Sequence, residues 1–312
     1  MNNNEKNFLL SLYDFNKSLT DSNKIKRLYT MSNNIEKYYN KFTIKKRNGK
    51  NREILSPSPD LKRIQKNILN ELLYDKRISE YAKAYKKGSG LVDNAKVHTG
   101  YKYILKLDIK DFFNSVSYVD IYNIFLEYGF SSSLCGLLSH LVTYDDYLPQ
   151  GAPTSPYLSN LLLRDFDYIV GNWCNKNNIN YTRYSDDLTF SMNEYNKDII
   201  RFIRKNLYKY NLELNNDKIC LINNSSKQKI TGIVVNDRIQ VDIKYRKKIR
   251  QEIYYINKYG LSNHLKRINI KNQNVYLNSL LGRINFVLSV DNSNKEFINY
   301  KKVINELIKW TF

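Results

Sequence analysis

The stretch YTRYSDDLTFS, residues 181–191, places two adjacent carboxylates, Asp186 and Asp187, between two runs in which apolar and polar residues alternate. Such alternation is typical of β-strands, so the stretch predicts a hairpin with the acidic pair at its bend. Two neighbouring negative charges repel each other unless a cation neutralises them, and Asp is a poor strand former. A bound metal ion explains the pair. A solvated turn is the alternative, because Asp also forms local backbone hydrogen bonds in turns.

A third carboxylate lies in another strand-like segment. Residues 104–109 alternate in the same way and carry Asp108 near their C-terminal end, ahead of a predicted helix at about 118–128. Asp108, Asp186 and Asp187 can therefore supply three carboxylates to one point, enough to hold two Mg²⁺ ions about 3.5–4 Å apart. Two such ions activate an attacking hydroxyl and stabilise a leaving pyrophosphate, which is polymerase chemistry. A two-metal nuclease is the alternative use of the same acids.

The overall charge favours a polyanionic partner. The 312 residues include 50 Lys and Arg against 30 Asp and Glu, a formal net charge of +20, and the chain also contains 27 Tyr. Cationic side chains neutralise phosphates, and aromatic rings stack on bases. Nucleic acid is therefore the predicted partner.

Cysteine usage and hydropathy bear on the compartment. Cys135, Cys174 and Cys220 are odd in number and widely spaced, which predicts neither a disulfide framework nor a zinc site and fits a reducing environment. The N-terminus has no apolar signal segment, and no charge-free run of about 18 residues could span a bilayer. We therefore expect a cytoplasmic protein with no membrane partner.

The first part of the chain predicts helices and a basic hairpin. Residues 1–40 form a helical N-terminal segment, whose second helix is expected at about 25–39. Asn48-Gly49 then joins two strand-like runs, 41–46 and 51–55. Both turn residues tolerate positive φ, so this dipeptide is a strong hairpin signal.

Later segments predict a further helix, a strand pair and a helical C-terminal third. Ser155 and Pro156 suit the N-cap and first position of one helix that continues through Ile169. Residues 230–235 predict a strand, and Asn236-Asp237 a turn into the next one. Three helices are expected after that, a basic amphipathic one at 244–256 and two more at 275–290 and 296–310.

Three motifs occur in the order found in reverse transcriptases, which the chain resembles from roughly residue 41 to its C-terminus. YSDD at 184–187 is similar to that family's YxDD box, DIKDFF at 108–113 to its first aspartate motif, and QGAPTSP at 150–156 to its QGxPxSP motif. The resemblance implies an α+β, right-hand polymerase with fingers, an antiparallel-sheet palm and a helical thumb. It also implies that the three aspartates are catalytic and bind two Mg²⁺ ions, with dNTPs as substrates.

The same resemblance implies three segments and a nucleotide site. The segments are the N-terminal helices at 1–40, fingers and palm at 41–240, and the thumb at 241–312. The implied nucleotide-binding residues are Lys46 and Arg52 on the basic hairpin, Phe113 as a steric gate against the 2′-hydroxyl, Gln150 and Gly151 beside the incoming nucleotide, and Lys218. The Lys218 ammonium could protonate the departing pyrophosphate. Core packing is the alternative for Phe113, and an ordinary surface position is the alternative for Lys218. Gly151 would let backbone approach a ligand closely.

Two further matches resemble retron reverse transcriptases. NAKVH at 94–98 fits their NAxxH box, and Ile230-Thr231-Gly232 stands where they carry VTG. The resemblance implies that Asn94, His98, Thr231 and Gly232 take part in recognising a cognate RNA. On the basic helix, Arg246, Lys247 and Arg250 are expected to contact phosphates, with a solvated face as the alternative.

The retron resemblance carries a functional expectation. It implies RNA-directed DNA synthesis on a cognate structured noncoding RNA that serves as template and primer. The DNA starts from a guanosine 2′-hydroxyl, so the product is 2′–5′ branched multicopy single-stranded DNA. RNA, enzyme and an accessory effector protein would together form an antiphage system.

Two other functions stay open. One is a group II intron type or other bacterial reverse transcriptase, although the chain is expected to lack room for a maturation or endonuclease domain after the thumb. The other is a noncatalytic RNA-binding protein with a vestigial palm, which would not need three carboxylates. The cognate RNA, its branching nucleotide, the effector and the oligomeric state are not encoded in any recognisable pattern.

Overall fold

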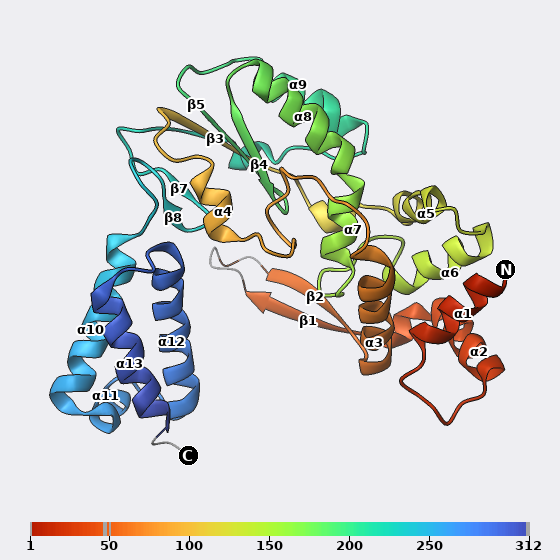
Figure 1. The fold of residues 1–312 in the computed structure, drawn as a ribbon, viewed down its shortest axis with the longest axis horizontal. Helices are drawn as coiled ribbons and strands as arrows, with labels where there is room; N and C mark the ends of the chain where they lie inside the picture. Colours follow the sequence, from red (N-terminus) through yellow and green to blue (C-terminus); the bar gives the residue numbers. More distant parts are fainter. Residues whose placement is uncertain (1, 46–48, 50, 310–312) are drawn as a thin grey trace. The chain divides into compact units, whose positions relative to one another are not determined.

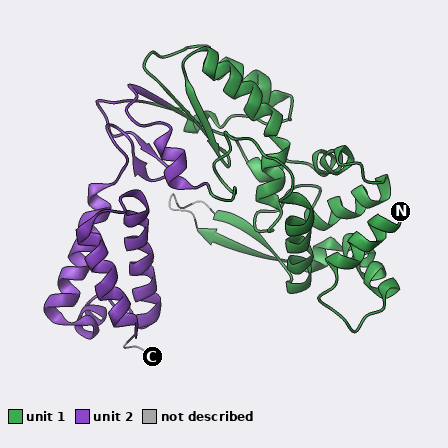
Figure 2. Ribbon diagram, viewed as in Figure 1, with its two compact units in different colours: residues 1–88, 105–221 green, residues 89–104, 222–312 purple. Residues whose placement is uncertain are grey.

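The computed structural model describes residues 2–45, 49 and 51–309. The chain divides into two compact units (Figure 2), of which unit 1 comprises residues 1–88 and 105–221 and unit 2 comprises residues 89–104 and 222–312. The three segments predicted from sequence do not coincide with these two units. The predicted segments correspond to the subdomains of a polymerase, whereas the units are the compact parts of the structure. Their assignment stays a prediction.

Unit 1 begins with helices and the expected basic hairpin. Its first elements are α1 (Asn3–Leu12), α2 (Asp21–Ser32), a 3₁₀ turn (Ile35–Tyr38), β1 (Tyr39–Lys45), β2 (Asn51–Pro57) and α3 (Pro59–Ile68), which a π-helical turn (Leu69–Leu73) extends. β1 and β2 pair antiparallel, so the two predicted strands are confirmed. The second helix ends at Ser32, earlier than expected, because the strand already begins at Tyr39. Asn48 of the predicted turn lies outside the described residues.

A small sheet with helices against it forms the rest of unit 1 (Figure 1). The strand order is β4-β5-β3-β6, with β3 (Tyr103–Asp108), β4 (Asn180–Tyr184), β5 (Asp187–Met192) and β6 (Cys220–Asn223). The helices are α5 (Tyr118–Glu127), α6 (Ser132–Val142), α7 (Ser155–Leu162), α8 (Arg164–Lys176) and α9 (Ile199–Tyr208). β4 and β5 pair antiparallel, and α8 packs along β4. The mixture of helices with antiparallel strands confirms the predicted α+β class.

The helix expected from Ser155 through Ile169 is two helices. The backbone leaves helical geometry at Leu163, which separates α7 from α8. Because Leu163 is itself fully buried, the apolar pattern of the sequence continues across the break and does not indicate where the first helix ends. The N-cap is Thr154, so Ser155 is already helical, and its hydroxyl donates to the Pro149 carbonyl. Ile169 is 40% exposed and does not share the buried face.

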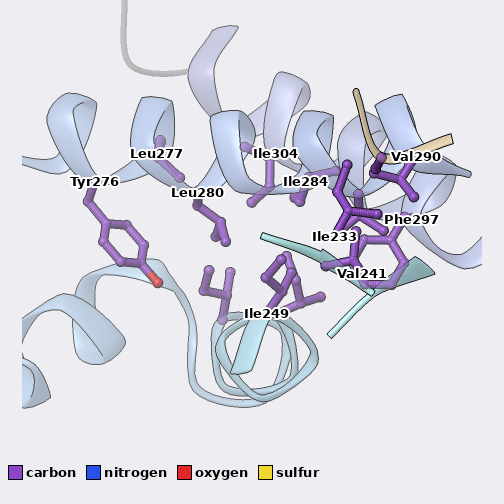
Figure 3. Packing of buried hydrophobic residues seen from close by; sticks show 14 of the residues in the cluster. Ile233, Val241, Ile249, Tyr276, Leu277, Leu280, Ile284, Val290, Phe297 and Ile304 are labelled. Carbon is purple, nitrogen blue, oxygen red and sulfur yellow. The ribbon is translucent and has the colours of Figure 1, made fainter. Parts of the chain in front are cut away.

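Unit 2 holds a three-stranded sheet and a helical bundle. Its elements are α4 (Leu91–Lys96), β7 (Lys229–Ile230), β8 (Ile233–Val234), β9 (Gln240–Val241), α10 (Ile243–Tyr259), α11 (Leu261–Arg267), α12 (Gln273–Val290) and α13 (Lys295–Lys309). The three predicted C-terminal helices are confirmed to within a few residues, whereas α11 was not expected. Figure 3 shows apolar side chains of α10, α12, α13 and the short strands packed together, with Ile249, Leu280 and Phe297 at most 1% exposed.

The prediction of one strand over residues 230–235 is wrong. Thr231 and Gly232 have φ angles of 46° and 90°, and they turn the chain between β7 and β8. Positive φ at both central residues is what a two-residue type I′ hairpin turn requires. The hairpin connection expected at Asn236-Asp237 is confirmed, because β8 and β9 pair antiparallel on either side of it, although the loop is longer than these two residues. The Asn236 side chain donates to the carbonyls of Asn224 and Ser226.

Within the described residues, no helix is long and apolar enough to cross a membrane.

Replacing either of two helical glycines by alanine is expected to change stability, in opposite directions. A Cβ built at Gly171 in α8 would overlap the ring of Tyr81, whose hydroxyl accepts a hydrogen bond from Asn175, whereas Gly282 in α12 faces open space. Overpacking costs about 1–3 kcal/mol, and a helical Gly→Ala change otherwise gains up to about 1 kcal/mol. We expect Gly171→Ala to lower the free energy of unfolding and Gly282→Ala to raise it in denaturant titrations. A stabilising Gly171→Ala would contradict this packing.

Candidate active site

The acidic motif occupies the tight turn between β4 and β5. The strand register pairs Tyr184 with Asp187, which leaves Ser185 and Asp186 as the two turn residues. Ser185 has a φ of 63°. The amide of Ile109, next to Asp108 at the end of β3, donates to the Asp186 carbonyl at 3.0 Å. This bond joins the turn to β3, so the structure brings the three predicted aspartates to the same end of the sheet.

The site carries negative charge that the protein only partly neutralises. Burial, followed by the charge of Asp108, raises the pKa of Asp186. Burial and then the charge of Asp186 raise the pKa of Asp187 to about 6. Nearby lysines lower these pKa values, Lys218 at both groups and Lys106 at Asp187, but burial and the neighbouring carboxylates outweigh them.

Lys218 supplies part of the compensating positive charge and contacts Asp108 directly. Its Nζ lies 2.8 Å from each carboxylate oxygen of Asp108. Burial opposes the ammonium charge, yet the hydrogen bond and the charge of Asp108 raise the pKa of Lys218. The sequence analysis gave Lys218 the role of protonating the departing pyrophosphate. The structure places its ammonium group beside the carboxylates.

The donor set suits a divalent cation, although it is not arranged around one. Within residues 2–45, 49 and 51–309, no three acidic, His or Cys side chains are placed so that they could hold a metal ion as they stand. Lys218 occupies both oxygens of Asp108. Carboxylate oxygens are the ligands that Mg²⁺ prefers, and uncompensated negative charge is what a divalent ion would neutralise. The residues therefore fit such an ion once Lys218 releases Asp108.

A buried ion pair lies beside the turn and is hydrogen-bonded to it. Arg183 and Asp167 are both fully buried, and they form two hydrogen bonds, Nε to Oδ1 at 2.8 Å and Nη2 to Oδ2 at 2.7 Å. The Tyr181 hydroxyl donates to the same carboxylate at 2.8 Å. The remaining guanidinium nitrogen, Nη1, donates to Asn160 Oδ1 at 3.0 Å and to the Ser185 carbonyl at 3.2 Å. Arg183 thus connects α7 and α8 to the turn that carries Asp186.

Sequence reasoning did not assign a role to Arg183. The available signal was the period of two along β4, which places Arg183 on the same face as the apolar Tyr181. An Arg on a face buried against a helix requires an acidic partner there, because an unpaired buried charge is very costly. The partner, Asp167, could not be selected among the acids of α8 from spacing alone.

The loop that begins at Gln150 is fixed to the basic hairpin. The Leu55 amide donates to the Gln150 carbonyl at 2.9 Å. Gly151 has a φ of 133°, and a Cβ there would lie 2.5 Å from the Leu55 carbonyl oxygen. The glycine was expected to admit a ligand, and in this structure it admits the backbone of β2.

The other predicted nucleotide residues are placed as follows. Arg52 is exposed on β2, Gln150 is partly exposed, and Lys46 lies outside the described residues. Phe113 is partly buried in a 3₁₀ turn, with its ring centre 5.4 Å from that of Phe112. Their roles in nucleotide binding stay predictions.

The predicted RNA-binding residues all lie in unit 2, but they differ in accessibility. Asn94 and His98 are fully buried, so any effect on RNA would act through the segment they hold in place. Thr231 donates to the Leu91 carbonyl at 3.2 Å, which connects the β7–β8 turn to α4, and Gly232 is exposed at that turn.

The three cations of the basic helix also differ. Arg250 is engaged by Glu296 through two hydrogen bonds of 2.7 and 2.6 Å. Lys247 is exposed to solvent. Arg246 is partly buried, and its Nε has no hydrogen-bond partner among the described residues. Arg246, Lys247 and Arg250 carry the same charge, but they differ in how accessible they are to a phosphate.

A small antiparallel sheet that brings acidic residues together at a hairpin turn, with helices against it, defines a nucleic-acid polymerase of the right-hand type. The family described as "Reverse transcriptase (RNA-dependent DNA polymerase)" matches residues 44–235. The chain belongs to the reverse transcriptase family, and it is an RNA-directed DNA polymerase.

The relatives place it with the retron enzymes. The chain is 28% identical over 296 residues to the retron Ec86 reverse transcriptase of Escherichia coli, covering 93% of this chain and 88% of that protein. It is 29% identical over 272 residues to the retron Ec83 reverse transcriptase of Escherichia coli, covering 81% and 83%. The retron-type resemblance is thus confirmed. Among solved structures, a telomerase from Candida albicans in complex with a fragment of telomeric RNA aligns with a TM-score of 0.49 and 12% identity, over 86% of this chain and 60% of that chain.

Arg183→Lys tests whether the buried ion pair positions the turn. Lysine keeps the charge beside Asp167 but loses the planar fork that reaches Ser185. Misplacing reacting groups by about 1 Å can cost about 100-fold in rate, so we expect kcat for dNTP incorporation to fall at least about tenfold. We also expect the Mg²⁺ concentration for half-maximal activity to rise.

Tyr181→Phe is the matched control for Arg183→Lys. It removes a hydrogen bond from the same buried network without touching the turn. We expect kcat close to wild type at a temperature below both melting points. Equal losses in the two variants would mean that the network contributes stability alone.

Asp187→Asn tests the uncompensated charge through pH. The folded-state pKa of about 6 lies above the ordinary value of 3.8, so ionised Asp187 destabilises the folded protein above pH 6, and the effect disappears below about pH 4. With a chelator present, we expect the variant to be more stable than wild type by about 1–2 kcal/mol at pH 8, and equal near pH 4. Adding Mg²⁺ should stabilise the wild type more than the variant. A pH-independent difference in thermal melts would refute this assignment.

Proposed function

We propose that this reverse transcriptase copies a cognate structured noncoding RNA into 2′–5′ branched multicopy single-stranded DNA. The observation that carries the proposal is the similarity to retron reverse transcriptases over most of the chain and most of their length. The NAxxH-like segment at 94–98 and the Thr231-Gly232 turn add support, because both belong to the retron pattern and lie in the same unit.

The catalytic part of the proposal assigns two Mg²⁺ ions to Asp108, Asp186 and Asp187. Bound there, the ions would activate the attacking hydroxyl and stabilise the leaving pyrophosphate. Lys218 Nζ contacts both carboxylate oxygens of Asp108 while the ions are absent. This contact raises the pKa of Lys218 and holds the side chain as an ammonium, which would have a proton to give to the pyrophosphate once it leaves Asp108.

The nucleotide would be positioned by the hairpin and the loop attached to it. Arg52 and Lys46 would contact the triphosphate, since a guanidinium suits bidentate phosphate contact. Gln150, Gly151 and Phe113 would border the sugar and base. Because β2 and the Gln150 loop share a backbone hydrogen bond, the phosphate contacts and the sugar contacts would move together.

RNA recognition would fall to unit 2. Thr231 and Gly232 present an exposed tight turn, and Asn94 and His98 hold the neighbouring segment from inside. Lys247 and Arg246 would neutralise phosphates. Arg250 would contribute mainly by orienting Glu296 and the end of the bundle, because its guanidinium is already paired.

The wider role follows from the retron type. We propose that the enzyme acts in the cytoplasm with its noncoding RNA, the DNA product and an accessory effector protein, as part of an antiphage defence. The +20 net charge supports the RNA partner, because phosphate neutralisation is the main source of affinity for nucleic acid.

The test is the nucleic acid that copurifies with the protein from cells carrying the gene and its native flanks. We expect a discrete single-stranded DNA joined to an RNA encoded beside the gene, and we expect debranching enzyme to change its mobility after RNase treatment. The variant with Asp186→Asn and Asp187→Asn should retain the RNA and lack the DNA. Wild-type protein that incorporates dNTPs on a supplied RNA template but carries no such DNA would overturn the retron product.

A further inference from the structure

A cavity of about 330 Å³ opens between β9, the first turn of α10 and the C-terminal end of α12. Val241 and Val290 form part of its apolar lining, and Figure 3 shows both at the same end of the bundle core. The rim is polar and carries Arg238, Arg246 and Asn294. An apolar floor with a few convergent polar groups is the usual composition of a small-ligand site.

Arg246 is incompletely satisfied in this cavity. Its Nε is buried without a hydrogen-bond partner among the described residues. A buried donor that loses its partner costs about 1–3 kcal/mol, and more when it is charged. The neighbouring cation, Arg250, shows the contrast, because Glu296 binds its guanidinium through two nitrogens. The charge of Glu296 acts on Arg246 as well, but both of its carboxylate oxygens accept from Arg250. An anionic ligand would supply the acceptor that Arg246 Nε lacks.

The other polar residues of the rim indicate which class of anion would fit the cavity. Arg238 adds a second guanidinium, which suits a phosphate group. Asp291 already accepts from Asn294 Nδ2 at 3.0 Å and from Ser293 Oγ at 3.1 Å. Each of its carboxylate oxygens keeps a second lone pair, which can accept from an N–H group of a base edge. A bare phosphate would leave the apolar floor uncovered, whereas a nucleotide would cover the floor with its base.

We propose that this cavity binds one unpaired nucleotide of an RNA, with its phosphate against Arg246 and Arg238 and its base over Val241 and Val290. Sequence-specific RNA recognition relies on unstacked bases that enter pockets, and a duplex base pair cannot enter a cavity of this size. The inference rests on the proposed function, because it assigns one contact of the RNA partner to a place in unit 2.

The first test compares two residues of α10. Arg246→Met removes the guanidinium from the cavity at similar volume, and Lys248→Met removes the same charge from an exposed position that has no assigned role. The probe is a short synthetic single-stranded RNA of mixed sequence, with an RNA duplex of equal length beside it. We expect affinity for the single strand to fall about tenfold in Arg246→Met, the effect of one charge-assisted contact, and less than about twofold in Lys248→Met. Equal losses, or no loss in either variant, overturn the pocket.

The second test uses the wild-type chain, so it decides the matter even if Arg246→Met is unstable. Single-stranded RNA that contains 4-thiouridine is irradiated with the protein, and crosslinked peptides are mapped by mass spectrometry. We expect crosslinks within 238–241 or 287–294, and crosslinks confined to other segments overturn the proposal. Full competition by free AMP or GMP overturns the RNA source and assigns the pocket to a mononucleotide.

Neither test needs the cognate RNA. DNA synthesis by the same wild-type preparation on poly(rA) primed with oligo(dT) shows that the protein is active. A missing branched DNA in cells would therefore overturn the retron product alone, whereas failed crosslinking by an active preparation would overturn the pocket alone.

Discussion

The burial of mutually repelling carboxylates at the end of the small sheet is the constraint on which the rest of unit 1 depends. Burial and neighbouring charge raise the pKa values of Asp186 and Asp187, so the fold holds these groups where they are least stable as ions. Such an arrangement persists only when the surrounding structure fixes it. The strand register, the bond from Ile109 to the turn and the buried Arg183 network together provide that fixation.

The buried ion pair is better explained by position than by stability. A buried pair recovers little net free energy, because desolvation offsets most of the attraction. Arg183 nevertheless satisfies three acceptors at once, Asp167, Asn160 and the Ser185 carbonyl. Asn160 in turn donates to the Ala84 carbonyl at 2.9 Å. One guanidinium therefore sets the distance between the turn, two helices and a neighbouring loop, which an apolar residue of similar volume could not do.

The sequence predicted elements well where one local pattern decided the outcome. Alternation located β3, β4 and β5, and Asp186 was correctly placed at the bend, whereas Asp187 is already the first residue of β5. Prediction failed where tertiary contacts override local preference. Thr231 is β-branched and disfavours a φ of 46°, yet its hydroxyl binds the Leu91 carbonyl and the residue becomes a turn. The break at Leu163 was equally invisible, because the residue that interrupts the helix is buried like its neighbours.

In the candidate site, too, some features could be predicted from the sequence, whereas the pairing of its charged side chains could not. Motif order brought the three aspartates into one hypothesis, but sequence cannot tell a cation that faces solvent from one that is already bound. Arg183, Arg250 and Arg283 each donate two hydrogen bonds to one carboxylate, because the planar guanidinium fork matches that group. Each pair removes one positive and one negative charge, so the net charge of +20 is unchanged while fewer guanidinium groups remain for phosphates. If the protein binds RNA as proposed, the electrostatic attraction would come from cations that face solvent, such as Lys247, and from arginines that bind no carboxylate, such as Arg246.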